Sequence, residues 1–210
     1  QFIPTSYLDY AVDFTGDGKR NIWSNDPSDA LASTAAYLKH FGWIQGQPWG
    51  VEVTIPNGFD YTLANRTIKK SPSKWAAFGV KGTNGPVANH GPASVLLPAG
   101  GEGAAFLIFN NFSVIEAYNT ADAYVIGVGH LSDRLKGGPA IKSDWPRWDR
   151  ALSFGERQEM QRRLTAQGFD TDGIDGKIGP KTIDAVRKFQ QSKGVLPDGY
   201  ASFALLKKLR

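Results

Sequence analysis

Apolar side chains recur every three or four residues in several stretches of this 210-residue chain, and glycine-rich or polar turns separate these stretches. The spacing predicts amphipathic helices, because residues three and four apart share one helix face. Leu31, Ala35 and Leu38 follow this pattern, and Gly42 is expected to end their helix. The helices predicted before residue 140 cover roughly 4–12, 28–40, 62–69, 73–78, 114–118 and 121–135.

Residues 43–109 have a different character, since they are rich in glycine, proline, tryptophan and β-branched residues. The apolar runs at 49–55 and 105–109 predict short strands. A Gly-Gly-Pro sequence at 137–139 then interrupts the helical pattern, and residues 144–150 are predicted to form a linker. The Trp-Pro-Arg-Trp sequence within this linker is suited to docking against one domain rather than floating in solvent.

The end of the chain predicts a small helical module. Ser153 and Glu156 match a capping box, in which two side chains satisfy exposed backbone amides at a helix start. The sequence GFDTDGIDGKIGPKT at 168–182 leads into a further helix, and Gly194 and the pair Asp198-Gly199 follow it. We expect the module's core to contain Leu152, Leu164, Phe169, Ile183, Val186, Phe189, Leu205 and Leu206.

This arrangement resembles the three-helix peptidoglycan-binding module of bacterial cell-wall enzymes, and the resemblance implies that the chain binds peptidoglycan. The charge distribution fits an anionic polymer, since residues 151–210 hold 11 Lys and Arg against 7 Asp and Glu, whereas residues 1–150 hold 13 of each. These basic residues are dispersed, and no recognised nucleic-acid motif accompanies them, so nucleic acid is not an expected partner.

Residues 1–136 contain short sequence blocks that occur in the same order in one enzyme family. The blocks include QFIPTSY at 1–7, YAVDFTGDG at 10–18, IW at 22–23, DA at 29–30, AY at 36–37, GW at 42–43, PWG at 48–50, PNGF at 56–59, NF at 111–112, YN at 118–119 and Y at 124. In this order they resemble the membrane-bound lytic murein transglycosylase B family.

The resemblance implies a mainly α fold with a small β region. It consists of a lysozyme-like catalytic domain, incomplete at its N-terminus, over 1–143, a linker over 144–152 and the three-helix peptidoglycan-binding domain over 153–210. It also implies cleavage of the bond between N-acetylmuramic acid and N-acetylglucosamine without water, because the muramyl 6-hydroxyl attacks and leaves a 1,6-anhydro end. One Glu with a raised pKa acts first as acid and then as base in this reaction. The substrate's own N-acetyl group stabilises the positive centre, unlike in the scheme with two carboxylates.

The general acid is expected to lie upstream of Gln1, because the family places it on a helix before the QFIP block. The chain alone is then expected to be inactive, and a non-catalytic peptidoglycan-binding protein with the same fold stays as the alternative. Glu116 is the only Glu beside the predicted cleft, and a solvated carboxylate on a helix face is its simpler interpretation. None of the five Glu matches the family's acid: Glu52, Glu102, Glu116, Glu156 and Glu159.

The resemblance assigns five residues to the sugar-binding groove: Gln1, Tyr37, Tyr118, Asn119 and Tyr124. Their chemistry suits this role, because aromatic faces stack on pyranose rings while amides pair with N-acetyl and hydroxyl groups. The alternative is that the tyrosines are core residues whose hydroxyls bond within the protein.

The sequence DFTGDGK at 13–19 resembles the start of an EF-hand, with oxygen ligands at positions 1, 3 and 5 and glycine at position 6. The closing Glu is absent, and Ser24 stands in its place. The family has a longer loop of this kind, so the resemblance implies a structural Ca²⁺ or Na⁺ site; the alternative is an Asp/Gly turn before a helix. The implied ligands are Asp13, Thr15, Asp17, the Lys19 carbonyl and Asp29.

Composition sets further limits. The absence of Cys excludes disulfides, thiolate zinc sites and a cysteine nucleophile. The apolar runs at 104–109 and 123–128 are shorter than the about 20 residues of a membrane span. Met160 is the only Met, so we expect a processed form or an excerpt. We expect a periplasmic, cell-wall-associated monomer that needs no cofactor for its chemistry. An outer-membrane anchor and a separate N-terminal segment as partner both stay open.

Overall fold

The computed structural model describes residues 2–210, which divide into two compact units. The first unit consists of Gln1–Gly50 and Ile108–Gly138, and the second consists of Val51–Leu107 and Pro139–Arg210. The described residues are mainly helical with one small four-stranded sheet, so the predicted fold class is confirmed. No helix in this part of the chain is both long and apolar enough to span a membrane.

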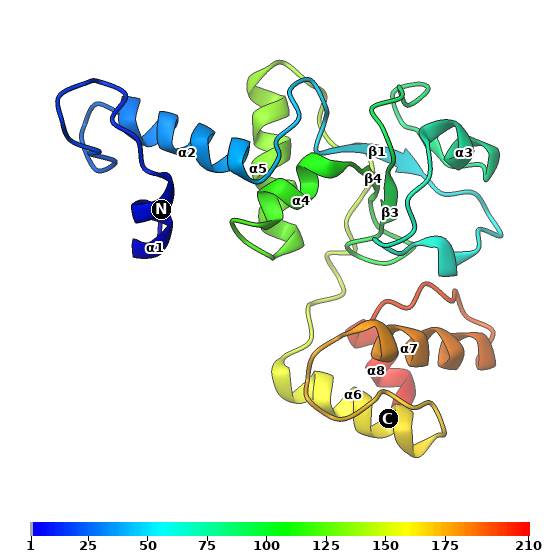
Figure 1. Ribbon diagram of the computed structural model, residues 1–210. Coiled ribbons are helices and arrows are strands. Elements are labelled where there is room, and N and C mark those ends of the chain that lie inside the picture. Colours follow the sequence, from blue (N-terminus) through cyan, green and yellow to red (C-terminus); the bar gives the residue numbers. More distant parts are fainter. Residues whose placement is uncertain (1) are drawn as a thin grey trace. The chain divides into compact units, whose positions relative to one another are not determined.

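The first unit is built from helices (Figure 1). Their bounds agree with the sequence pattern except at the start of the third, which begins four residues earlier than predicted. On the second helix the buried residues are Asp29, Ser33 and Tyr37, whereas Leu31 is 66% exposed, so the apolar spacing located the helix but not its buried face. The four helices are α1 (Pro4–Tyr10), α2 (Ser28–His40), α4 (Asn110–Glu116) and α5 (Asp122–Leu135).

A buried amide explains the early start of α4. Asn111 is fully buried, and its side-chain Oδ1 accepts a hydrogen bond from the Ile44 amide at 2.8 Å. Its Nδ2 donates to the carbonyl oxygens of Ile44 and Gln47 at 2.8 and 2.7 Å. A buried polar side chain is stable only with such partners. Asn111 therefore joins α4 to the loop that follows α2.

The sheet belongs almost entirely to the second unit. It has the strand order β2–β1–β4–β3, and β1 and β2 are antiparallel with Val53 opposite Gly82. The residues of β4 are all buried, as its uninterrupted apolar sequence predicts. The strand bounds are β1 (Gly50–Thr54), β2 (Lys81–Gly82), β3 (Ser94–Leu96) and β4 (Ala105–Ile108).

The prediction of a helix over 62–69 is wrong, because only the 3₁₀ turn η1 (Tyr61–Leu63) forms there. Asn65 accepts hydrogen bonds from both the amide and the hydroxyl of Thr67 at 2.9 Å. Such local side-chain bonds give the backbone an alternative to the helix. The neighbouring α3 (Pro72–Ala77) does form, as predicted.

Three helices form the module at the end of the second unit: α6 (Phe154–Ala166), α7 (Pro180–Ser192) and α8 (Phe203–Leu209). The predicted capping box of Ser153 and Glu156 is present at the start of α6. The predicted core is largely confirmed, but Phe169 and Ile183 are only partly buried: Phe169 packs against the core, and Ile183 lies against Gly199. The buried core consists of Leu152, Met160, Leu164, Ala185, Val186, Phe189, Leu205, Leu206 and Leu209.

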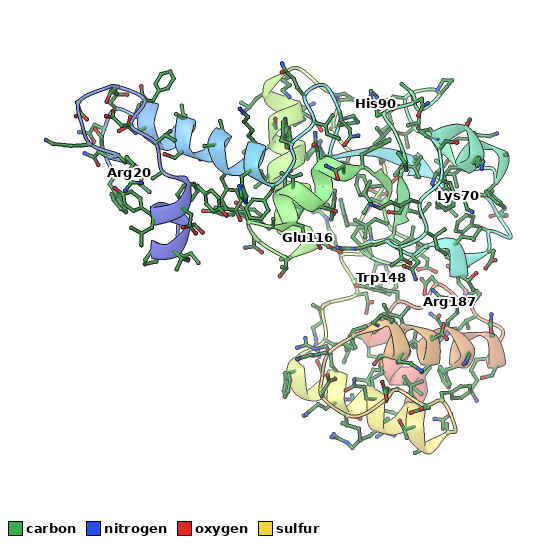
Figure 2. The ribbon with its side chains drawn as sticks, in the orientation of Figure 1. Arg20, Lys70, His90, Glu116, Trp148 and Arg187 are labelled. Atoms are coloured by element: carbon green, nitrogen blue, oxygen red, sulfur yellow. The ribbon has the colours of Figure 1, made fainter. Side chains whose placement is uncertain are left out.

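Within the second unit, the module packs directly on the β-rich residues. Arg187 on α7 donates from Nη2 to the Tyr61 carbonyl oxygen at 3.2 Å (Figure 2). Asp198 accepts a hydrogen bond from the Gly101 amide at 2.8 Å. A side chain at Gly101 would place its Cβ 2.7 Å from Leu196, so this approach requires glycine. In the linker, Trp145 docks by stacking on Phe106 at 6.4 Å.

Candidate functional site

The first unit contains an aromatic cavity of about 590 Å³. Tyr37 reaches it from α2, Tyr118 from the turn after α4, and Tyr124 from α5. Sequence reasoning assigned these three tyrosines to the groove, but it did not place Phe2 or the tryptophans there. We call this space the aromatic cavity, and its aromatic lining consists of Phe2, Trp23, Tyr37, Trp43, Trp49, Tyr118 and Tyr124.

Tyr118 contacts both of the other tyrosines. Tyr118 and Tyr124 stack with ring centroids 5.9 Å apart and an angle of 19° between the planes. Tyr37 meets Tyr118 edge to face at 5.6 Å. Burial, with a smaller contribution from neighbouring tyrosines, raises the pKa of both Tyr37 and Tyr118. Their hydroxyls therefore remain protonated and able to donate at neutral pH.

Tyr37 and Asn119 differ from the other predicted groove residues in their contacts. Tyr37 is 5% exposed, and its hydroxyl donates to the Ala117 carbonyl oxygen. Asn119 is exposed and is not among the residues that line the aromatic cavity, and its Oδ1 accepts from the Ala121 amide at 3.0 Å. The prediction for Gln1 falls outside the described residues.

Asp133 is the only carboxylate among the described residues that line the aromatic cavity. Its Oδ2 accepts a hydrogen bond from the Trp49 indole Nε1 at 2.7 Å. Gly129 allows this indole to approach, because a Cβ there would lie 2.6 Å from the ring. Asp133 thus positions the Trp49 ring in the cavity lining, which is a structural role for this carboxylate.

The five Glu residues are also engaged or distant. Glu52 accepts hydrogen bonds from three donors, the amides of Lys142 and Ser143 and the Thr83 hydroxyl. Burial alone would raise the pKa of Glu52, but these hydrogen bonds outweigh burial, so its pKa is lowered. Arginine partners lower the pKa of Glu156 and of Glu159 to about 2. Glu116, at the end of α4 (Figure 2), and Glu102 do not line the aromatic cavity. A general acid needs a raised pKa.

The acidic loop before α2 brings three carboxylates together. Oxygen atoms of Asp13, Asp17 and Asp29 all lie within 4.8 Å of one another. Asp29 is buried, and its carboxylate accepts the backbone amides of Phe14 and Thr15 at 2.9 and 3.2 Å and a third loop amide at 2.9 Å. Burial raises the pKa of Asp29, but these hydrogen bonds together outweigh burial, and the pKa is lowered.

The remaining predicted ligands lie in the same loop. Asp13 accepts the amides of Gly16 and Gly18 at 2.7 and 2.8 Å, and both glycines have positive φ. The Thr15 hydroxyl lies 3.4 Å from Asp13, and the Lys19 amide donates to an Asp17 oxygen at 2.8 Å. Clustered carboxylates held by backbone donors are the oxygen ligands that a hard cation prefers. The donor set therefore fits Ca²⁺ or Na⁺.

The alternative of a simple turn with Asp29 as helix cap fits less well. Asp29 lies inside the first turn of α2, and Pro27 occupies the cap position without a side-chain cap bond. The carboxylate of Asp29 instead bonds amides of the loop. Asp29 therefore organises the loop rather than the helix start.

Comparison with known proteins supplies the family. Residues 1–133 match the family described as Transglycosylase SLT domain, and residues 155–209 match the peptidoglycan binding domain family. The chain belongs to the Transglycosylase SLT domain family. Both resemblances inferred from the sequence, to lytic murein transglycosylase B and to the peptidoglycan-binding module, are confirmed.

Several members of this transglycosylase family are similar to the chain. Membrane-bound lytic murein transglycosylase B of Escherichia coli (strain K12) is 39% identical over 141 residues, which cover 64% of this chain and 36% of that protein. SltB3 from Pseudomonas aeruginosa, crystallised with NAG-anhNAM-pentapeptide and with NAG-NAM-pentapeptide, is 52% identical with a TM-score of 0.93. This match covers 100% of our chain and 57% of SltB3. The chain thus spans about a third to somewhat over half of these relatives.

Proposed function

We propose that this chain is part of a lytic transglycosylase that cleaves the bond between N-acetylmuramic acid and N-acetylglucosamine in peptidoglycan. The reaction proceeds without water and yields 1,6-anhydromuramyl products. The aromatic cavity carries this proposal, because it offers stacked Tyr118 and Tyr124 rings of the kind that bind pyranose faces. The complex of SltB3 with NAG-anhNAM-pentapeptide supports the nature of the product.

The general-acid Glu is proposed to lie on a segment upstream of Gln1. The aromatic cavity supports this, since its one described carboxylate, Asp133, is bonded to an indole. The lowered pKa of Glu52 is opposite to what proton donation requires. The greater length of the relatives leaves room for such a segment. The chain alone is then inactive, although it holds the aromatic cavity.

The residues of this chain act by binding and orienting the glycan. The Tyr118 and Tyr124 rings offer stacking surfaces, and protonated tyrosine hydroxyls donate to ring substituents. Asn119 is exposed and uses its Oδ1 within the protein, so its Nδ2 is proposed to donate to an N-acetyl carbonyl. Stacking and directed donors restrict the motion of a bound sugar. Such restriction is how positioning groups lower a reaction barrier.

The acidic loop is proposed to hold a structural Ca²⁺ or Na⁺ through Asp13, Thr15, Asp17, the Lys19 carbonyl and Asp29. The cation supplies no chemistry to the reaction. It would fasten the loop to α2, whose buried face carries Asp29, Ser33 and Tyr37 in succession. The loop is joined to the same face by a hydrogen bond from the Val12 amide to the Ser33 hydroxyl at 3.0 Å. The cation thereby supports the position of Tyr37.

Because its proposed substrate is peptidoglycan, we expect the protein to act in the periplasm, at the cell wall. We also expect it to act as a monomer on the glycan strands. The module over residues 155–209 would keep it on the wall. A separate N-terminal segment that supplies the acid would be its one protein partner.

The experiment is digestion of purified sacculi, with products read by mass spectrometry for 1,6-anhydromuramyl ends. It compares this chain with a version extended upstream through its gene. Release of anhydro products by the extended form alone supports the proposal. Activity of the short chain would overturn the upstream acid, and hydrolytic reducing ends would overturn the anhydro mechanism. If neither form cuts while both pellet with sacculi, the protein is a non-catalytic peptidoglycan binder.

A further inference from the structure

The second unit contains its own cavity, of about 210 Å³, which we call the junction cavity. It lies where the loop at 99–102, the linker and the helical module meet. Trp148 of the linker stands at this place (Figure 2). The polar and aromatic residues that line the junction cavity and carry the argument are Glu102, Trp148, Asp149, Asp198, Tyr200 and Lys208.

Two of the lining carboxylates build the walls. Asp198 accepts three hydrogen bonds, from the amides of Gly101 and Tyr200 and from the side chain of Gln190, at 2.7–2.9 Å. Asp149 accepts the Ala204 amide at 3.0 Å. These bonds connect the loop, the linker and the module. The junction cavity is therefore a preformed space within one compact unit.

Four other lining groups have no hydrogen bond or ion pair to a described side chain. They are the Glu102 carboxylate, the Lys208 ammonium, the Tyr200 hydroxyl and the Trp148 indole. Trp148 is 70% exposed, although Trp145 in the same linker stacks on Phe106. An exposed tryptophan beside open polar groups is typical of a surface that binds a ligand.

The charges of the junction cavity indicate the ligand. Three carboxylates, of Glu102, Asp149 and Asp198, line the cavity together with a single ammonium, that of Lys208, so the lining has a formal excess of two negative charges. Such an excess favours a ligand ammonium, which an indole face also attracts. Lys208 remains available for a ligand carboxylate. Burial, then Asp149 and Asp198, raise the pKa of Tyr200, so its hydroxyl stays a donor.

We propose that the junction cavity binds the free zwitterionic end of an amino acid in the peptide stems of peptidoglycan. The choice of polymer rests on the proposed function. The ligand ammonium lies toward Glu102 and the Trp148 face, and the ligand carboxylate toward Lys208 and the Tyr200 hydroxyl. The volume is below the roughly 300–1,000 Å³ of sites for drug-sized ligands, so it suits one residue rather than a disaccharide-peptide. A neutral sugar would leave both the Glu102 carboxylate and the Lys208 ammonium without a charged partner.

The test is an NMR titration of the ¹⁵N-labelled 210-residue chain with free diaminopimelate, which carries two zwitterionic amino-acid ends. We expect saturable shifts of the Trp148 indole N–H and of the Gly101 and Ala204 amides. Trp148→Phe identifies the indole signal. Lysine amidated at its carboxyl and acetylated at its α-nitrogen lacks the zwitterion and is expected to bind at least about tenfold more weakly, or about 1.4 kcal/mol.

Matched variants on α8 separate specific binding from general attraction. Lys208→Ala is expected to weaken diaminopimelate binding about tenfold. Lys207→Ala removes the same charge one residue earlier, where the ammonium lies 4.7 Å from the Phe203 ring, and is expected to leave the affinity unchanged. Glu102→Gln keeps the side-chain shape and should weaken binding as Lys208→Ala does. Equal effects of both Lys substitutions would overturn the proposal.

The ligand controls decide the remaining outcomes. Saturable shifts of the same signals with N-acetylglucosamine and none with diaminopimelate would identify a sugar site and overturn the amino-acid assignment. Absence of shifts with either ligand would overturn the proposal entirely. The titration uses neither sacculi nor turnover. Binding without anhydro products would therefore contradict only the proposed reaction, and anhydro products without binding would contradict only this inference.

Discussion

The Tyr37 hydroxyl lies 2.9 Å from the Ala117 carbonyl oxygen and donates a hydrogen bond to it. The two residues are 80 positions apart in the chain, and Ala117 immediately precedes Tyr118. The bond therefore joins α2 to the turn that presents the stacked Tyr118 and Tyr124 rings. Tyr37 therefore has a structural role in addition to lining the aromatic cavity.

Tyr37→Phe tests this structural role. The substitution leaves the Ala117 carbonyl without its donor, so we expect a loss of about 1 kcal/mol in the free energy of unfolding. Tyr37→Ala also removes the buried ring and is expected to cost about 3–5 kcal/mol. Urea unfolding measures both. Unchanged stability of Tyr37→Phe together with loss of glycan binding would assign the hydroxyl to the substrate instead.

The acidic loop gives a prediction on metal binding. Ca²⁺ at about 100 times its dissociation constant is expected to stabilise the first unit by about 2.7 kcal/mol and to raise its melting temperature by roughly 5 °C or more. Asp17→Asn keeps the side-chain volume and should abolish the rise, because it removes one of three convergent charges. Asp26→Asn lies outside the cluster and is the control. Thermal melts with calcium and with a chelator provide the measurement.

An unchanged melting temperature of the unsubstituted chain at millimolar calcium would contradict the calcium site. A rise in melting temperature with Na⁺ but not with Ca²⁺ would identify the bound ion as Na⁺. A rise that survives Asp17→Asn would place the ion elsewhere in the chain.

The features that could be predicted from the sequence are those formed by residues close together in the chain. The acidic loop and the capping box at Ser153 have fixed local spacings, and both sets of side chains meet in the structure. The aromatic cavity depends instead on contacts across the chain, such as Phe2 with Tyr118 at 6.3 Å. No local period encodes these contacts. The buried face of α2 was not predicted for another reason: Asp29 and Ser33 are buried by hydrogen bonds to the preceding loop, and an apolar helix period does not mark polar positions.

Glu156 gives a pH prediction for the module. The Arg150 guanidinium at 2.5 and 2.7 Å, followed by the Ser153 amide, lowers the pKa of Glu156 from 4.5 to about 2. A depressed folded-state pKa contributes stability that is present above pH 4.5 and lost as the pH falls toward 2. Glu156→Gln should therefore lower the protection of the α6 amides against hydrogen exchange at neutral pH. In this variant the protection should also fall less steeply between pH 4.5 and pH 2.

Amide hydrogen exchange of α6 at several pH values measures this effect, and it avoids the assumption that both units unfold together. Glu102→Gln, an exposed substitution outside the module, is the control and should leave the exchange of α6 unchanged. An identical decline in Glu156→Gln and the unsubstituted chain would show that the Arg150 pair contributes nothing to the module.

Asp133 provides the last prediction, because it is the described carboxylate that lines the aromatic cavity. If its role is to hold Trp49, Asp133→Asn keeps an oxygen acceptor for the indole and should retain both stability and anhydro-product release in the extended protein. Asp133→Leu leaves the indole donor unpaired and should cost about 1–3 kcal/mol in unfolding free energy. A catalytic acid behaves oppositely, since an amide cannot donate the proton that the leaving oxygen needs. Loss of product release in Asp133→Asn with unchanged stability would therefore move the general acid from the upstream segment to Asp133.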